Sequence, residues 1–404
     1  MDDIAPPTFV PWPYRGRPRH DELFSSWFLR AAHAMDIKPY ALGHISWRSS
    51  PPPLTRDIDG SADERVLSVM SRATLTPMEQ CRQTLLSSYE GFLFEIHQPL
   101  GRTSWIMPLG VRARTRHHPG LQFCPACMVD APRFRRLWRV GWATICVPHR
   151  LRLLDRCSQC DSILAPLRAP TAFVCHHCLA ALADNDQRPA SDEVIEFQRR
   201  QETILAAGWA QLGESHFPYS VQYFQTVRRV ARVLAFGPRS AALRDTVMRR
   251  WGGDGRAPFL TPTSEVEALD ADDRYRLFDL VARIMQAWPG RFVAAASSAR
   301  LWQSWALRDG PAPPFAYADI VSKHLTRPAY SPSIEEVEAA AEYLRRRKPD
   351  FTRRDLIQLV GDSENVAAVF GQERRRRRRL LMAAMRRSSV YSGRLIGRAP
   401  FSSS

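Results

Sequence analysis

The sequence predicts a mostly α-helical protein of several domains, built around a metal-binding module. Three observations lead to this prediction. The chain has 404 residues, enough for two to four domains of ordinary size. Seven of its eight cysteines fall between residues 121 and 180, most of them in Cys-x-x-Cys pairs. On both sides of that segment apolar residues recur at helical intervals, and capping residues and prolines mark where helices begin and end.

Residues 1–104 are predicted to form an N-terminal helical domain. A proline-rich entry ends near Asp21, after which Leu23, Trp27 and Ala31 share one helical face. Residues 62–88 have the pattern of a helix-turn-helix, with Thr76 as the predicted cap of its second helix. The same shape is common in all-α domains that do not bind DNA, so both interpretations stay open. Residues 105–120 lack periodicity and are predicted to be a linker.

The cysteine module, residues 121–183, carries two sets of ligands typical of structural zinc sites. Each set consists of two ligand pairs separated by a loop, which is the spacing of zinc ribbons. The first set is Cys124, Cys127, Cys146 and His149, and the second is Cys157, Cys160, Cys175 and Cys178. Four protein ligands close a tetrahedral shell, so the sequence predicts two structural Zn²⁺ ions and no catalytic metal. His176 or His177 could replace a cysteine at the second site.

Basic and aromatic residues alternate between the paired ligands of the first set. Arg133, Arg135 and Arg136 are candidate DNA contacts, while Phe134 and Trp138 suit either a binding surface or the small core of the module.

The C-terminal part is predicted to be a helical domain over 190–325 and a helix-turn-helix-like unit over 331–386. In that unit Ser333 and Thr352 cap two helices, and a third helix runs into a block of arginines. The candidate DNA contacts here are Arg353, Arg354, Arg374, Arg375, Arg376, Arg377, Arg378 and Arg379. The alternative is a small helical subdomain with a solvated extension. Residues 387–404 are predicted to be a basic, disordered tail.

Charge supports a polyanionic partner. The chain has 57 Lys and Arg against 41 Asp and Glu, and ten arginines with no acid lie between Arg374 and Ser404. An excess of this sign favours nucleic acid. Neither a secretory signal nor a membrane-spanning run is evident, so we expect a cytoplasmic protein, associated with the bacterial nucleoid when bound to DNA.

The motifs together resemble the TniQ family of transposition proteins over roughly residues 9–180, and the length is similar to that of members from mercury-resistance-type transposons. The N-terminal helix contributes Glu22, Leu23, Ser25, Trp27 and Arg30 to the resemblance. The module contributes Phe123, Cys124, Pro125, Cys127, Phe134, Trp138, Arg139, Cys146, His149, Leu153, Leu154, Cys157 and Cys160. The family usually has glycine where this chain has Arg150 and Asp161.

The resemblance implies a non-catalytic accessory protein, not an enzyme. Such a protein would bind DNA or a target-recognition complex, recruit an AAA+ ATPase regulator and, through it, the transposase; a homodimer is possible. One alternative is a stand-alone zinc-containing transcription regulator. A nuclease or transposase would need clustered carboxylates, and the only local candidates are Glu265, Glu267, Asp270, Asp272 and Asp273, which better suit a solvated segment that caps a helix.

Overall fold

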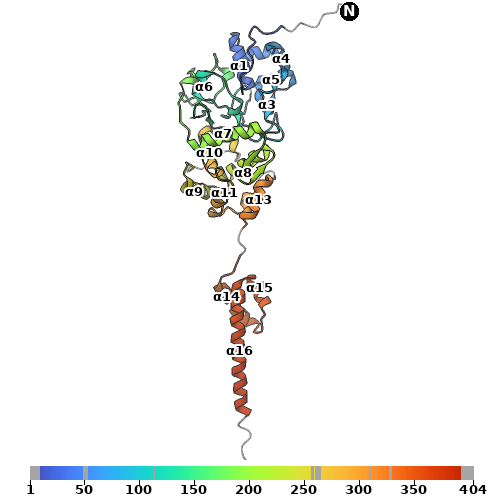
Figure 1. The fold of residues 1–404 in the computed structure, drawn as a ribbon, viewed down its shortest axis with the longest axis vertical. Coiled ribbons are helices and arrows are strands. Elements are labelled where there is room, and N and C mark those ends of the chain that lie inside the picture. The colour runs from blue at the N-terminus through green and yellow to red at the C-terminus, as the bar shows by residue number, and fades with distance from the viewer. Residues whose placement is uncertain are drawn as a thin grey trace, which may run out of the picture. The chain divides into compact units, whose positions relative to one another are not determined.

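The chain divides into two compact units, residues 1–326 (unit 1) and 327–404 (unit 2). The structure, a computed structural model, describes residues 10–48, 53–112, 114–255, 259, 265–308, 312–326 and 330–392, with side chains to residue 385. These residues contain sixteen α-helices and two short antiparallel hairpins (Figure 1). The predicted, mostly α-helical class is confirmed. The helix-turn-helix character of the predicted helix pairs stays a prediction.

Unit 1 begins with five helices whose apolar faces enclose a small core of their own. They are α1 (Phe24–Ala34), α2 (Pro39–Trp47), α3 (Ile58–Ser61), α4 (Glu64–Thr74) and α5 (Met78–Arg82). The expected cap of α5 was wrong. Pro77 occupies that position without a side-chain cap, and the buried hydroxyl of Thr76 instead accepts a hydrogen bond from the Thr74 hydroxyl at 2.8 Å. The Thr76 hydroxyl is thus bonded to a residue before the helix and does not cap it.

The cysteine module follows with little regular structure, as its many turn residues lead one to expect. It holds one short helix, α6 (Pro125–Asp130), and one hairpin, β1 (Ile145–Cys146) with β2 (Leu151–Arg152). In the hairpin register Cys146 lies opposite Leu151. His149 follows Cys146 by three residues, within the tight connection between β1 and β2, so the two residues lie at the same end of the hairpin.

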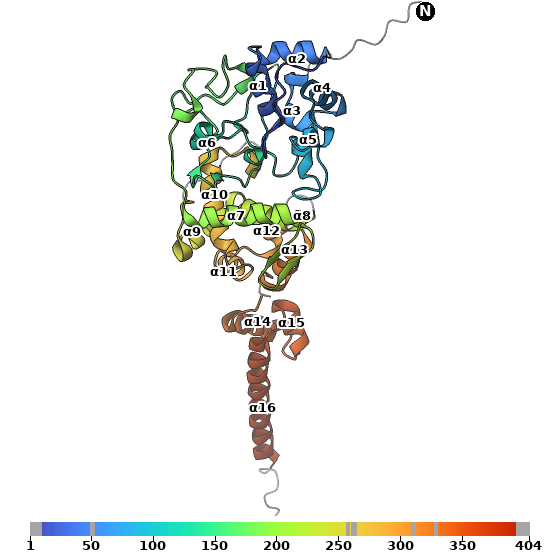
Figure 2. The ribbon, with the colours of Figure 1, turned by 45° about the horizontal axis from the view of Figure 1, so that its top comes forward.

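The rest of unit 1 is helical apart from one hairpin, and Figure 2 shows α7 crossing the unit beside α8. The elements are α7 (Asp192–Ala207), β3 (Ala210–Leu212), β4 (Ser215–Phe217), α8 (Ser220–Ala235), α9 (Ser240–Trp251), α10 (Ala271–Met285), α11 (Gly290–Ser298), α12 (Gln303–Ala306) and α13 (Phe315–His324). One hydrophobic core joins these helices to the cysteine module.

Two tryptophans, Trp105 and Trp142, pack against helices α10 and α8 in this core. The rings of Trp142 in the module and Phe224 in α8 stack with centroids 5.7 Å apart. The ring centroid of Trp105 lies 6.0 Å from that of Phe278 in α10. Both Trp105 and Leu109 are buried in the shared core. Residues 105–120, which their lack of periodicity predicted to be a linker, therefore contribute core side chains. Sequence periodicity does not detect core segments that are neither helix nor strand.

Unit 2 consists of three helices around a core of its own. They are α14 (Ile334–Arg347), α15 (Arg353–Val360) and α16 (Glu364–Ser392). The predicted caps are confirmed: Ser333 with Glu336, and Thr352 with Asp355, form complete capping boxes at the starts of α14 and α15. Helix α16 includes the first six residues of the predicted tail, and residues 393–404 lie outside the described part of the chain.

Candidate metal centres

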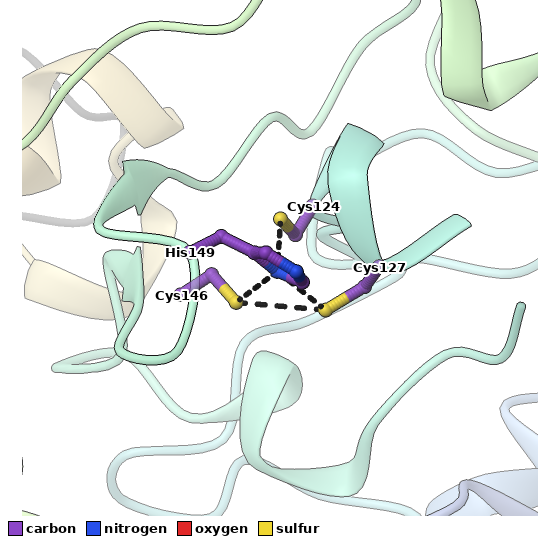
Figure 3. A group of neighbouring side chains, drawn as sticks. All are labelled: Cys124, Cys127, Cys146 and His149. Carbon is purple, nitrogen blue, oxygen red and sulfur yellow. Dashed lines mark hydrogen bonds between the residues drawn. The ribbon is translucent and has the colours of Figure 1, made fainter. Parts of the chain in front are cut away.

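The first ligand set converges on one point (Figure 3). Cys124 and Cys127 come from the start of α6, while Cys146 and His149 come from the β1–β2 hairpin. His149 Nδ1 lies 3.5, 3.2 and 3.3 Å from the sulfurs of Cys124, Cys127 and Cys146, respectively. A tetrahedral zinc ion with bonds of about 2.3 Å to sulfur would separate its sulfur ligands by about 3.8 Å. The Cys127–Cys146 sulfur separation of 3.5 Å is close to that value.

His149 is also held from its other side. Its Nε2 lies 2.8 Å from the carboxylate of Asp130, the last residue of α6. A carboxylate on the second ring nitrogen fixes the tautomer that leaves Nδ1 free to bind a metal. Asp130 could not be predicted from the sequence, because nothing in the spacing of one aspartate distinguishes it from a surface residue.

The second set also converges, and all four of its ligands are cysteines. The Cys157 and Cys178 sulfurs are 3.6 Å apart, and those of Cys160 and Cys175 are 3.7 Å apart. All four sulfurs lie within 4.8 Å of one another. Neither His176 nor His177 belongs to this group, so the open alternative of a histidine ligand loses its support. Each cluster could hold one metal ion.

In each cluster, a residue with a left-handed backbone conformation directly follows one ligand pair. Arg150, directly after His149, has a φ of 57°, and Asp161, directly after Cys160, has a φ of 55°. Glycine reaches this region without steric cost, while other residues, aspartate less than most, are strained there. The two positions where glycine is expected from the family pattern therefore keep the glycine conformation with a side chain present.

The remaining cysteine is of a different kind. Cys81 is buried in α5, and burial raises the pKa of its thiol to about 11. A thiol of that pKa is neutral at physiological pH and behaves as a small apolar residue.

The first turn of α1 fastens the N-terminal helices to the cysteine module. The Leu23 amide donates to the Phe134 carbonyl at 3.0 Å, and the Phe134 amide donates to the Ser26 hydroxyl at 3.0 Å. The buried Glu22 carboxylate accepts from the Ser26 hydroxyl and from the Arg30 guanidinium, at 3.0 and 2.8 Å. The charged residues of the N-terminal motif thus have an architectural role.

A second contact between the N-terminal helices and the module centres on Arg139, whose side chain is fully buried. The Arg139 guanidinium of the module binds the Asp57 carboxylate at 2.6 Å and lies 3.4 Å from that of Asp59 in α3. Asp59 also accepts the amide and hydroxyl hydrogen bonds of Ser25, at 2.7 and 2.8 Å. Burial by itself would raise the pKa of Asp57, but the Arg139 charge outweighs it and lowers that pKa. Burial and the charge of Asp57 raise the pKa of Asp59.

The candidate DNA contacts of the module are engaged within the fold. Arg135 and Arg136 both pair with Asp21, at 3.0 and 3.5 Å, and their side chains are only 15% and 18% exposed. Arg133 donates to the His20 carbonyl at 3.1 Å. Partners more than a hundred residues away in sequence were not visible in the local basic pattern.

The acidic segment that leads into the first turn of α10 is engaged in the same way. Glu267 is buried, pairs with Arg228 at 2.7 Å and accepts the Trp105 amide at 2.8 Å. Asp270 caps α10 by accepting the Asp273 amide. The other three acids also lie beside arginines: Glu265 beside Arg102, Asp272 beside Arg188 and Asp273 beside Arg276. The capping role was expected, whereas the burial of Glu267 was not.

The arginine block lies on α16 and divides into two groups. Arg376 and Arg377 pair with Glu373, at 3.9 and 3.1 Å, and Arg345 of α14 binds the same carboxylate. The others are exposed and form no ion pair among the described residues; they are Arg374, Arg375, Arg378 and Arg379. On α15, Arg353 pairs with Asp362 at 3.0 Å.

Comparison with known families identifies the N-terminal part. Residues 13–153 match the family model described as TniQ. The chain contains a TniQ domain. It runs from before α1 to just after β2, so it includes the first ligand cluster and ends before the second. No curated protein matches the chain.

The TniQ domain marks a transposition-associated accessory protein, and the family is generally non-catalytic. The resemblance seen in the sequence is thereby confirmed for these residues. Among the helices of the described ranges, none combines the length and the apolar content that a membrane span requires.

Proposed function

We propose that the chain is a non-catalytic accessory protein of DNA transposition that binds DNA and recruits an AAA+ ATPase regulator to the insertion site. The observation that carries the proposal is the match to the TniQ family model, whose residues include the first ligand cluster and the Arg139–Asp57 ion pair. A protein with this role works in the bacterial cytoplasm, at the nucleoid while it is bound to DNA. The length further suggests a mercury-resistance-type transposon.

The two clusters fit structural Zn²⁺ best. Thiolates are soft ligands, and sets of four thiolates, or of three thiolates and an imidazole, in tetrahedral arrangement are typical of zinc. The eight proposed ligands are those named from the sequence, now with Asp130 behind His149. Elemental analysis of the purified chain should find two equivalents of zinc. A well-folded chain with fewer than two would contradict this assignment.

We place the DNA-binding surface on unit 2. Arg374, Arg375 and Arg378 are exposed on α16 without ion-pair partners among the described residues, and Arg354 is exposed at the start of α15. Free guanidinium groups on a helix suit phosphate contacts, which supply most of the sequence-independent affinity for DNA. We leave Arg133, Arg135 and Arg136 out of this surface, because binding phosphate would require the last two to give up Asp21.

The test is the salt dependence of DNA binding. The triple variant Arg374→Gln, Arg375→Gln, Arg378→Gln should bind any duplex more weakly at low salt, and the slope of log affinity against log salt should fall by up to about 3, since each phosphate contact contributes about 0.9. The matched control is Arg65→Gln, Arg239→Gln, Arg249→Gln, which removes three exposed arginines of unit 1. Equal slopes for the two triple variants would contradict the proposed surface.

A second candidate is the stand-alone transcription regulator. It is favoured by the compactness of unit 2, a three-helix unit with its basic helix last. A regulator would act without an ATPase partner. A transposition assay with and without the ATPase regulator therefore separates the two functions: if insertion proceeds equally well in both, the recruitment proposal fails.

A further inference from the structure

Unit 1 contains a cleft of about 890 Å³ that none of the eight cluster ligands lines. Residues 97–111 form much of its wall, and α8 contributes to it as well. A narrower recess adjoins the cleft, since the two share four lining residues, which are Arg56, Asp57, Leu109 and Val111. The cleft and its recess, here together called the unit 1 cleft, form one continuous surface.

Positive charge is in excess in the unit 1 cleft. Each of its carboxylates lies beside an arginine: Glu265 beside Arg102, Glu267 beside Arg228, and Asp57 and Asp59 beside Arg139. Four further arginines of the lining form no ion pair within the described ranges, and they are Arg56, Arg114, Arg116 and Arg232. Seven guanidinium groups therefore stand against four carboxylates, so the unit 1 cleft suits an anionic occupant.

Arg116, in the recess, has the strongest need of an anion. Its guanidinium is half-buried and donates to the Leu164 carbonyl at 2.8 Å, a neutral acceptor. The neighbouring carboxylates of Asp57 and Asp59 are bound to Arg139. Burial and the positive charge of Arg139 lower the pKa of Arg116 to about 10. An anionic group placed in the recess would offset this unfavourable environment of the Arg116 charge.

The rest of the lining favours a protein segment over nucleic acid. Its larger part is aliphatic, with Leu100 74% exposed, and no Phe, Tyr or Trp is among the described residues that line it. In the recess, the Tyr40 ring is covered by the Arg114 guanidinium, 4.8 Å from the ring centroid. Single-stranded nucleic acid binds by stacking its bases on aromatic rings, which the unit 1 cleft does not offer. An extended protein segment can instead place aliphatic side chains on this wall and spaced carboxylates beside the unpaired arginines.

We propose that the unit 1 cleft binds an acidic, aliphatic segment of a protein partner, with one carboxylate in the recess beside Arg114 and Arg116 and another beside Arg232. The inference rests on the proposed function, within which this segment belongs to the AAA+ ATPase regulator. Hydrogen bonds between guanidinium and carboxylate groups give the contact its orientation, and the aliphatic wall adds buried apolar area. Recruitment then uses unit 1, whereas the proposed DNA contacts lie on unit 2, so either can be impaired without the other.

The test is the Kd of the purified ATPase regulator for the metal-loaded full chain without DNA, measured by surface plasmon resonance. Arg56→Glu with Arg232→Glu should raise this Kd by about tenfold or more, because like charges then meet the acidic segment. Arg56→Lys with Arg232→Lys should bind nearly as well as the wild type, since the charges are kept. Leu100→Asp should also weaken binding, because it places a carboxylate on the aliphatic wall.

The matched control is Arg65→Glu with Arg239→Glu, which reverses two exposed arginines of unit 1 outside the unit 1 cleft. It should bind the regulator like the wild type. Thermal melts should show that every variant is folded, and the salt dependence of DNA binding should be the same in all of them.

Three outcomes would overturn the inference. If the wild type and the Arg56→Glu, Arg232→Glu variant bind the regulator equally well, or if the control is as weak as that variant, the cleft is not the docking site while the recruitment proposal stands. If the wild type does not bind the regulator at all, both the inference and the recruitment proposal fail. If the variant loses binding to oligo(dT) but not to the regulator, the cleft belongs to single-stranded nucleic acid instead.

Discussion

The cysteine module and unit 2 are both small, and they are stabilised in different ways. Each has too few residues to bury much apolar surface. Unit 2 forms three helices with complete capping boxes and a small core of its own. The module has one short helix and one hairpin, and its shape depends on two ligand clusters and on contacts with neighbouring elements. Local signals therefore specify unit 2, while ligands and distant partners specify the module.

Metal removal should have the largest effect and should separate the two regions. Structural zinc supplies about 10–16 kcal/mol of apparent binding free energy in small zinc domains, and a module organised by two ions should lose its structure without them. We expect a strong chelator, or Cys127→Ser or Cys160→Ser, to abolish amide protection in the module. Protection in unit 2 should be unchanged, as measured by hydrogen exchange with mass spectrometry.

Cys81→Ser is the control for the thiol substitutions, because it changes a cysteine that belongs to neither cluster. It should retain two metal ions and a protected module. If the module keeps its protection when the metal is gone, the contrast between the two regions is wrong.

The same contrast explains what the sequence predicted well. The two convergent clusters were predicted because each ligand pair is local and its spacing is typical of structural zinc sites. The caps Ser333 and Thr352 were identified because a capping box is complete within four residues. Both kinds of signal can be read without knowing the tertiary structure.

What the sequence did not predict depends on distant partners. Arg139 meets Asp57 across 82 positions, and Arg135 meets Asp21 across 114, so a basic segment that suggested DNA binding is largely internal. Thr76 failed as a cap for a local reason: Pro77 occupies the cap position, and the Thr76 hydroxyl accepts from Thr74, two residues before it. Charge patterns give the composition of a segment but not which of its charges remain exposed.

The second largest effect should come from the buried ion pairs of the module. Arg139→Met leaves the buried Asp59 and the partly exposed Asp57 without their cation, and breaking a buried pair typically costs about 3–5 kcal/mol in the free energy of unfolding. Arg102→Met, which breaks an exposed pair with Glu265, should cost less than about 1 kcal/mol. Urea unfolding of unit 1 measures both.

The cost of Arg139→Met should also depend on pH. In the wild type the folded-state pKa of Asp57 is lowered, so its contribution is present above its unfolded pKa and is lost as pH falls through the folded value. In the variant, burial without Arg139 raises that pKa, so stability is lost as pH rises. The difference between the two proteins should therefore shrink from pH 7 towards pH 4, and a difference that is constant with pH would contradict the ion-pair assignment.

Unit 2 should respond to its caps instead. Ser333→Ala and Thr352→Ala should each lower its stability by about 1 kcal/mol, because each leaves helix-initial amides without an acceptor. Ser322→Ala, which removes a hydroxyl outside unit 2, is a control for the substitution itself. Neither cap variant should change metal content. If the cap variants destabilise the module as much as unit 2, the two regions are not stabilised independently.

The smallest expected effect is on the stability of the module, at the left-handed residues that follow its ligand pairs. Arg150 holds a φ of 57°, and the left-handed region costs a non-glycine residue about 1–2 kcal/mol. Glycine removes that strain but gains about 0.5–1 kcal/mol of conformational entropy in the unfolded chain, so Arg150→Gly should stabilise the module only slightly. Arg150→Ala keeps the strain and loses the exposed pair with Asp192, which makes it the informative control. Thermal unfolding with metal bound should rank the glycine variant above the alanine variant. The opposite order would mean that the Arg150 side chain, rather than the backbone conformation, determines the stability of this turn.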